Sequence, residues 1–206
     1  EHRRARRDEL VLAAVRAVRR HGAGVGMDDV AAEAGTSKTV VYRYFGDKGD
    51  LYLAVCRHVA DRLLGQLAAP LHAPAEPRAQ LAGAIDAYLS VIEADPEVYR
   101  FVVHAPLPDR PVADDPVAGL SSLVGAHVAG VIADRLAAAG KDTSAAGPWG
   151  HGLVGMVRSA ADHWLADGNR MTREQLRDHL TDLVWAGLAG VLAAAGLDHD
   201  SRQENP

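Results

Sequence analysis

Residues 30–48 read VAAEAGTSKTVVYRYFGDK, and this stretch decides the fold of the N-terminal part of the chain. Its apolar residues recur at helical spacing on both sides of Gly35, a residue that suits a tight turn. Ser37 follows the turn as an N-cap, so the pattern predicts one short helix before Gly35 and a second that ends near Tyr44. Two short helices joined in this way form a helix-turn-helix.

The two predicted helices have an inner and an outer face. Ala31 and Ala34 are small enough for the helices to cross closely. Val30, Val41 and Phe45 are apolar and can pack inward. The residues that remain on the outer face, or that follow the second helix, are the candidate DNA-binding residues: Ser37, Lys38, Thr39, Val40, Tyr42, Arg43, Tyr44 and Lys48.

The outer face has the chemistry of a DNA reader. Free N–H groups at a helix N-terminus bind phosphate, and the second helix of such a motif lies in the major groove. There Lys38 or Arg43 can bond a guanine edge, while Thr39 and Val40 can touch a thymine methyl group. The alternative is a helical hairpin with a Tyr/Phe core that binds no nucleic acid.

This stretch resembles the DNA-binding signature of the TetR family of bacterial one-component regulators, which runs roughly Ile-Ala-x-x-Ala-Gly-Val-Ser-x-x-x-Leu-Tyr-x-Tyr-Phe-x-x-Lys. The matching residues are Val30-Ala31, Ala34-Gly35-Thr36-Ser37, Val41-Tyr42, Tyr44-Phe45 and Lys48. Close resemblance covers about residues 8–65, and residues 153–190 are similar to the last two helices of many members. Three departures bear on operator sequence and affinity: Gly26 for a capping Thr, Thr36 for an apolar residue and Val40 for a frequent Thr.

The resemblance implies a regulator, usually a repressor, that binds a palindromic operator as a homodimer. It also implies a variable helical domain that binds a small-molecule effector. In the family layout, an effector that shifts the helix at 96–104 tilts the helix at 48–69 and changes the spacing of the two DNA readers.

Charge is divided unevenly along the 206 residues, whose formal net charge is −5. Residues 1–62 carry a net charge of +3 and residues 63–206 a net charge of −8. A basic front on an acidic body is typical of a segregated nucleic-acid-binding module, although the same residues can simply solvate a helix. Likewise, the N-terminal Arg3, Arg4, Arg6 and Arg7 can reach phosphates or the minor groove, or can form a disordered tail.

The whole chain is predicted to be all-α, because no alternating apolar pattern demands a strand. Three prolines within residues 70–77 mark a junction. We therefore expect a DNA-binding domain at 1–69, including a linking helix at 48–69 ended by Pro70, and an effector-binding and dimerisation domain at 70–206. A capping box at Thr172 starts the last helix, which Gly196 is expected to end.

Two further surfaces are predicted in the second domain. The candidate effector pocket is mostly apolar with a few polar groups, which favours a lipophilic or aromatic ligand, and its residues are Tyr88, Ile92, Phe101, His104, Leu120, Val124, His127, Met156 and Trp164. The candidate dimer interface uses the apolar and glycine positions of the last two helices: Leu153, Val157, Leu180, Val184, Gly187, Leu188 and Val191. Plain core packing is the alternative for both sets.

The sequence contains few features of other classes of protein. No catalytic motif, metal-binding His pair or cofactor loop is present, so we expect no enzyme, no bound cofactor and no metal site. Ten histidines leave a metal-sensing regulator as an alternative, with a helical-bundle enzyme as a more distant one. No apolar run is long enough for a transmembrane helix, and the single Cys56 suits a reducing compartment, so we expect a cytoplasmic protein without membrane contact.

Overall fold

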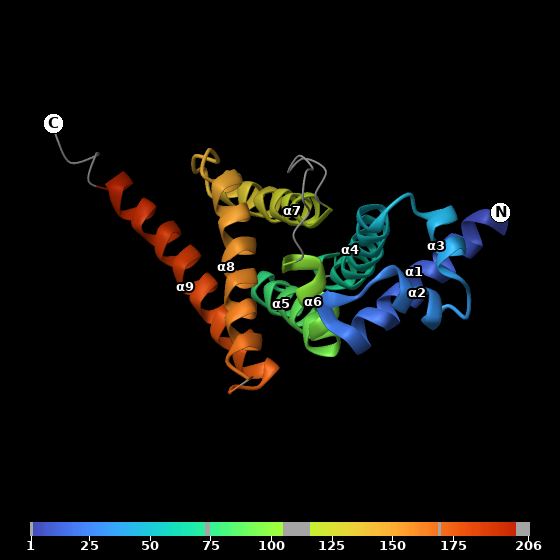
Figure 1. The fold of residues 1–206 in the computed structure, drawn as a ribbon. Helices are drawn as coiled ribbons and strands as arrows, with labels where there is room; N and C mark the ends of the chain where they lie inside the picture. The colour runs from blue at the N-terminus through green and yellow to red at the C-terminus, as the bar shows by residue number, and fades with distance from the viewer. Residues whose placement is uncertain (1, 73–74, 105–115, 169, 201–206) are drawn as a thin grey trace. The chain divides into compact units, whose positions relative to one another are not determined.

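The structure is a computed structural model that describes residues 2–72, 75–104, 116–168 and 170–200, and all their side chains except 23, 71–72, 104, 116–120, 188–189 and 191–200. Every regular element in these ranges is a helix, which confirms the all-α prediction (Figure 1). The elements are α1 (His2–His21), η1 (Gly22–Gly24), α2 (Met27–Glu33), α3 (Lys38–Tyr44), α4 (Lys48–His72), α5 (Pro77–Ala94), α6 (Pro96–His104), α7 (Pro116–Ala138), α8 (Ala146–Ala166) and α9 (Arg173–Asp200).

The helices form two compact units that do not follow chain order. Residues 1–67 and 90–120 form one, called here the N-terminal unit, and residues 68–89 and 121–206 form the C-terminal unit. The expected domains at 1–69 and 70–206 would separate α6 from the N-terminal helices, whereas α6 belongs to the same compact unit as those helices. The prolines at 70–77 suggest a domain boundary that leaves α6 in the second domain. The buried face of α6 packs into the core of the N-terminal helices, so α6 belongs to the N-terminal unit.

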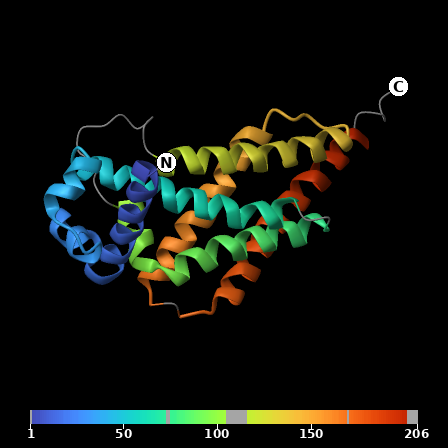
Figure 2. The ribbon, with the colours of Figure 1, turned by 90° about the vertical axis from the view of Figure 1, so that its right-hand side faces the viewer.

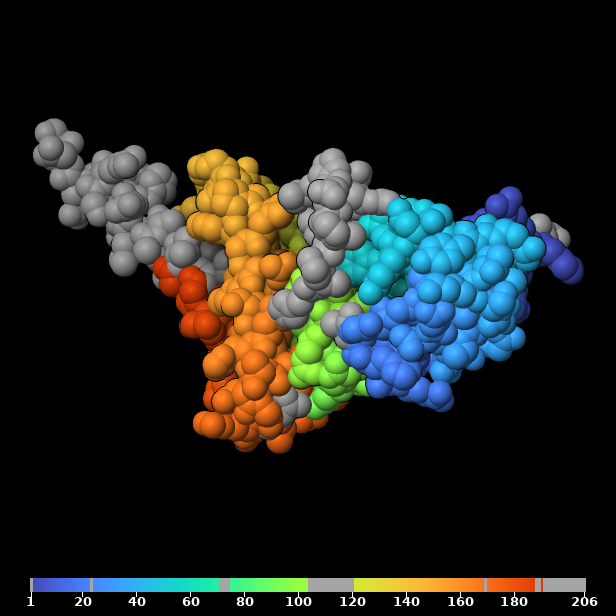
Figure 3. Space-filling view, viewed as in Figure 1, coloured from blue at the N-terminus to red at the C-terminus, as the bar shows by residue number. Residues whose placement is uncertain are grey.

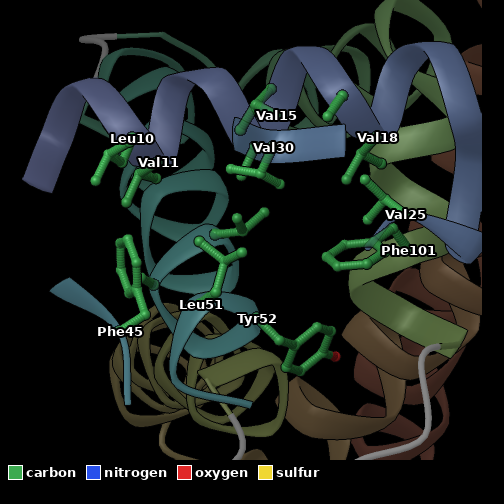
Figure 4. Close-up of a cluster of buried hydrophobic side chains, with 14 of the residues drawn as sticks. Leu10, Val11, Val15, Val18, Val25, Val30, Phe45, Leu51, Tyr52 and Phe101 are labelled. Atoms are coloured by element: carbon green, nitrogen blue, oxygen red, sulfur yellow. The ribbon is translucent and has the colours of Figure 1, made fainter. Parts of the chain in front are cut away.

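The N-terminal unit is built around one hydrophobic core. Side chains from α1, α2, α3, α4 and α6 point toward a common centre in Figure 4, with Val30, Leu51 and Phe101 among them. The apolar stripe of α1 supplies seven buried residues, which reflects the helical spacing of its valines, leucines and alanines. Burial of this stripe explains why a helix that begins with four arginines in its first six residues packs stably.

Helix α6 is tied to this unit by polar bonds as well as by packing. The buried Tyr52 hydroxyl donates a hydrogen bond to the Val102 carbonyl at 2.8 Å, and its ring meets Phe101 edge-on at 5.2 Å. At the other end of α6, Asp95 pairs with Arg19 of α1 at 2.6 Å and with Arg62 of α4 at 3.4 Å. Since both ends are held, α6 is fastened to α1 and α4.

Replacing Tyr52 by Phe is expected to lower the free energy of unfolding by about 1–3 kcal/mol, because the Val102 carbonyl would be left buried without its donor. Val102 lies in the last turn of α6, where helix carbonyls have no partner within the helix. Urea unfolding measures the change. Tyr42→Phe makes the same chemical change on an exposed residue and should leave the stability unchanged; equal effects of the two variants would contradict the role given to the Tyr52 hydroxyl.

Ion pairs join α5 to α9 in the C-terminal unit. Asp86 of α5 accepts from Arg173 of α9 at 3.0 Å, and Arg78 pairs with Asp182. The predicted capping box at Thr172 is present: its hydroxyl accepts from the Gln175 N–H at 3.2 Å, and its own N–H donates to the Gln175 side chain at 2.8 Å.

Helices α7 and α8 cross closely in the same unit. A Cβ atom on Gly150 would lie 2.5 Å from both the Ala129 nitrogen and the Gly125 carbonyl oxygen, so only glycine fits at this crossing. Ile132 and Leu136 of α7 are buried nearby with Ala146 of α8. The crossing therefore depends on backbone contact as well as on apolar side chains.

Two predicted helix ends are wrong. Helix α4 continues through Pro70 to His72, because a proline in the last turn removes only one late hydrogen bond, and Pro70 packs against Gly83 of α5. Helix α9 continues through Gly196 to Asp200, because an internal glycine costs only about 1 kcal/mol relative to alanine and does not by itself end a helix. The predicted loop at 105–114 lies outside the described residues. None of the described helices is both long and apolar enough to cross a membrane.

Candidate nucleic-acid interface

The turn between α2 and α3 is set by a Schellman motif. Gly35 has a φ of +60°, its N–H bonds the Ala32 carbonyl at 3.1 Å, and the Thr36 N–H bonds the Ala31 carbonyl at 2.9 Å. A glycine pays no steric penalty in this left-handed conformation. The turn therefore ends α2 and leads directly into α3.

Hydrophobic burial orients α3. Val30, Val41 and Phe45, the three residues expected to pack inward, are completely or almost completely buried. The guanidinium of Arg7 from α1 lies over the Phe45 ring, 4.9 Å from its centroid, and closes the core at that end. With its inner face held by these contacts, α3 has one defined outer face.

The outer face carries the side chains that the sequence assigned to it. Most of the candidate DNA-binding residues are exposed, and Val40 and Tyr44 are half-buried; the exposed ones are Ser37, Lys38, Thr39, Tyr42, Arg43 and Lys48. Residues around 40, light blue in Figure 3, form part of the visible surface of the N-terminal unit. The candidate set is thus displayed on one short helix and the segment that follows it.

Capping side chains hold both ends of this segment. Ser37 accepts a hydrogen bond from the Val40 N–H at 3.4 Å, as expected for the N-cap of α3. Asp47 accepts from the Asp50 N–H at 2.7 Å, which starts α4 and positions Lys48 in its first turn. The start of α3 is thereby held in place beside the exposed side chains of its outer face.

Two of the cations on the outer face have close partners. Lys38 Nζ lies 2.7 Å from the Asp28 carboxylate of α2, and this hydrogen bond together with the charge of Asp28 holds the pKa of Lys38 above its ordinary value. The Arg43 guanidinium lies 5.7 Å from the centroid of the Tyr44 ring, which supports it beside α3.

Sequence comparison agrees with this geometry over both units. Residues 10–55 match the family described as "Bacterial regulatory proteins, tetR family". Residues 66–200 match the family described as "Tetracyclin repressor-like, C-terminal domain". The chain belongs to the TetR family. It is therefore a transcriptional regulator with a DNA-binding helix-turn-helix, and not an enzyme.

Relatives in the TetR family span most of the chain. An uncharacterised HTH-type transcriptional regulator of Mycobacterium tuberculosis is 36% identical over 210 residues, which covers 100% of this chain and 87% of that protein. The HTH-type transcriptional activator FasR of Mycolicibacterium smegmatis is 28% identical over 188 residues, covering 90% of this chain and 84% of FasR.

Solved structures share the fold at lower identity. A TetR-family regulator from Streptomyces coelicolor matches with a TM-score of 0.75 and 22% identity, over 93% of this chain and 83% of that one. The regulator FadR of Bacillus subtilis, solved in complex with stearoyl-CoA, matches with a TM-score of 0.72 and 13% identity, over 85% of this chain and 96% of that one.

The candidate effector residues of this TetR-family regulator fall in both compact units. In the N-terminal unit, Ile92 is buried and Phe101 lies in the core beside Tyr52. A cavity of about 10 Å³ next to Phe101 has room for about one water and is far too small for an effector. In the C-terminal unit, Trp164 is buried and donates its ring N–H to the Met171 carbonyl at 2.8 Å.

The other candidate pocket residues have less decisive positions. Half-buried positions in the C-terminal unit are held by Tyr88, Val124, His127 and Met156. The side chains of His104 and Leu120 lie outside the described residues. Core packing accounts for Phe101 and for Trp164, and an effector pocket in this unit stays a prediction.

One part of the apolar stripe of α9 is buried inside the subunit, and another part is exposed. Leu180 and Val184, which the sequence assigned to the dimer interface, are buried inside the subunit. Leu153 and Val157 are half-buried, Gly187 is exposed, and the side chains of Leu188 and Val191 lie outside the described residues. Among the α9 side chains that the structure describes, the large apolar ones that are exposed are Leu183 and Trp185, which the interface assignment omitted.

Sequence reasoning missed two contacts of the DNA-reading region. Asp28 and Lys38 are ten residues apart, and only the crossing of α2 with α3 brings them together. Arg7 was grouped with Arg3, Arg4 and Arg6 as a basic arm or a solvated tail, and its contact with the Phe45 ring was not predicted.

Among the described residues, no group of three His, Cys, Asp or Glu side chains is arranged to hold a metal ion. The metal-sensing alternative therefore has no candidate site in that part of the chain.

Arg43→Gln is expected to weaken binding to every duplex and to reduce the dependence of log affinity on log salt by about 0.9, as loss of one phosphate contact requires. Fluorescence anisotropy over a salt series measures both quantities. Arg158→Gln removes the same charge from an exposed position on α8 and serves as the control. Identical salt slopes for wild type and Arg43→Gln would show that Arg43 makes no phosphate contact.

Proposed function

We propose that this regulator is a cytoplasmic repressor that binds a palindromic operator as a homodimer and leaves it when a small lipophilic or aromatic effector binds. The observation that carries the proposal is the exposed face of α3, where Lys38, Tyr42 and Arg43 project from a helix whose inner residues are buried. Inserted in the major groove, such a face meets base edges through its central residues and the phosphate backbone through Arg43, while the helix N-terminus meets phosphate.

A homodimer is supported by surface features of α8 and α9. Leu183 and Trp185 are large apolar side chains exposed on α9. A Cβ atom on Gly152, Gly155 or Gly187 would meet nothing within 4 Å, so another helix has room to approach these positions. The helices α8 and α9 are joined by a short turn and separate toward the C-terminal end of α9 (Figure 2). Two such pairs related by a two-fold axis would make a four-helix interface and would present two DNA readers to two half-sites.

Control by an effector is supported by the attachment of α6. Because Asp95 pairs with Arg19 and Arg62, a displacement of α6 acts directly on α1 and α4. An effector changes operator affinity only if it binds one arrangement of these helices better than the other. The structure of FadR of Bacillus subtilis contains stearoyl-CoA, so stearoyl-CoA is the first lipophilic probe to use here.

Fluorescence anisotropy with the duplex upstream of the protein's own gene tests the proposal, with a scrambled duplex beside it. We expect selective binding that weakens steeply with salt, because phosphate contacts release counterions. If both duplexes bind weakly and equally, in vitro selection from random duplexes replaces the first probe. If the folded protein binds none of the selected sequences at low salt, the proposal is wrong.

A reporter gene placed behind the selected operator tests the direction of control. Repression predicts higher expression when the regulator is deleted, and addition of an effector should reproduce that increase. Lower expression on deletion would make the protein an activator, as FasR is named. Equal operator affinity with and without a panel of lipophilic and aromatic compounds would contradict effector control.

A further inference from the structure

The acidic side chain of Asp28 contacts the DNA-reading helix directly. Asp28 lies in the first turn of α2, and Lys38 is the first residue of α3. The carboxylate Oδ2 and the ammonium Nζ are 2.7 Å apart, although 73% of the Asp28 side chain and 49% of the Lys38 side chain are exposed. The contact is therefore formed at the surface that would face DNA.

Neighbouring carboxylates have local structural roles that Asp28 does not share. Asp29 accepts the Gly26 N–H at 2.7 Å and thereby caps α2. Asp47 accepts the Asp50 N–H at 2.7 Å and caps α4. Since Asp29 caps α2, the partner of the Asp28 carboxylate is the cation of α3.

The pair changes what Lys38 can gain from DNA. Away from DNA the opposite charges of Asp28 and Lys38 offset each other, so the pair has no net charge. The contact with Asp28 also raises the pKa of Lys38. A contact from Lys38 to a backbone phosphate would bring that anion close to the Asp28 carboxylate, which lies 2.7 Å from the Lys38 ammonium, and the two negative charges would repel each other. A guanine edge is different, because it is uncharged and offers both N7 and O6 as acceptors to the same ammonium.

We propose that Asp28 is a specificity-determining residue that keeps Lys38 from backbone phosphates, so that Lys38 joins DNA at a guanine of the operator and not on unrelated sequence. This inference rests on DNA binding by α3 as proposed above. It gives Asp28 a role in lowering the affinity for competing sites, which outnumber operators by many orders of magnitude in a genome.

Asp28→Asn is expected to raise the affinity for unrelated DNA. The amide keeps the shape of the side chain but releases Lys38, which then adds one phosphate contact. For a scrambled duplex, we expect affinity to rise about fivefold at low salt and the dependence of log affinity on log salt to steepen by about 0.9. For the duplex selected in vitro by the wild-type protein, we expect a smaller rise in affinity. The affinity for the selected duplex divided by that for the scrambled duplex should therefore fall.

Three further variants separate this role from a general effect of charge. Asp61→Asn makes the same charge change on an exposed residue of α4, about 20 Å along the helix from Lys48, and should leave the affinity ratio unchanged. Lys38→Gln should weaken binding to the selected duplex about tenfold and leave the scrambled duplex nearly unaffected. In the double variant with Lys38→Gln, Asp28→Asn should no longer raise affinity for the scrambled duplex.

The outcomes distinguish this inference from the proposed function. If the wild-type protein shows no selectivity for any duplex, DNA reading by α3 falls and this inference falls with it. If wild type is selective but Asp28→Asn changes both affinities by the same factor as Asp61→Asn, only the role of Asp28 is overturned. The same conclusion follows if the effect of Asp28→Asn survives in the Lys38→Gln background. Unchanged circular dichroism and an unchanged unfolding midpoint in each variant show that the comparison is made between folded proteins.

Discussion

Replacing Leu183 by Glu is expected to convert a dimer into a monomer and to lower affinity for a palindromic operator by about 10²–10⁴-fold, the range lost when two linked binding events become independent. Leu183 is 60% exposed on α9, so the change need not disturb the interior of the subunit. At a two-fold interface, however, the same substitution enters twice and places carboxylates of both subunits in an apolar contact. The loss of the dimer is therefore expected because assembly would bury the new carboxylates, and not because the subunit unfolds.

Sedimentation velocity and anisotropy with a palindromic duplex measure the two parts of this prediction. Leu123→Glu is the matched control, because Leu123 is a 57% exposed leucine on α7, outside the proposed interface. The control should remain a dimer with wild-type affinity. A dimeric Leu183→Glu protein with unchanged operator affinity would exclude this face of α9 from the interface.

Gly150→Ala is expected to lower the free energy of unfolding by about 3 kcal/mol, at the upper end of the usual cost of overpacking. The added methyl group would lie 2.5 Å from two backbone atoms of α7, the Ala129 nitrogen and the Gly125 oxygen. Backbone of a packed helix cannot give way as the end of a flexible side chain can, so α7 and α8 must separate. In a chain of this size the change corresponds to a fall in melting temperature of about 6–12 °C.

Thermal and urea unfolding of Gly150→Ala should be compared with Gly147→Ala. Gly147 is in the first turn of α8, and a Cβ atom there would meet nothing within 4 Å. Alanine at that position should be neutral or stabilising by up to about 1 kcal/mol, because it favours the helix. Equal stability of the two variants would contradict the close crossing of α7 and α8.

Local interactions made the DNA-reading region predictable from sequence. The helical spacing around Gly35 predicted which residues are buried, and the burial of Val30, Val41 and Phe45 agrees. The capping role of Ser37 and the left-handed turn at Gly35 involve residues only a few positions apart. Patterns of this range depend on helical periodicity and on backbone preference, which a sequence displays directly.

The C-terminal unit was less predictable because its helices are apolar over wide faces. On α9, Leu180 and Val184 pack inside the subunit while Leu183 remains exposed, although all three belong to one apolar stripe. When an apolar stripe is wider than one packing face, the sequence does not indicate which of its residues pack into the subunit's own core and which remain exposed. In the N-terminal unit, Phe101 packs edge-on against Tyr52, which favours the core-packing alternative for this candidate pocket residue.

The sequence by itself determined the all-α class, the helix-turn-helix and the residues on its outer face, because these depend on spacing within a helix and on the turn between neighbouring helices. Tertiary structure alone decided that α6 packs with α1 and α4, that Asp95 pairs with an arginine 76 residues away, and that Asp28 holds Lys38. Many partners of suitable charge or size exist along the chain for each of these groups. Only the packed fold selects one, since buried area and backbone geometry are properties of the assembled helices.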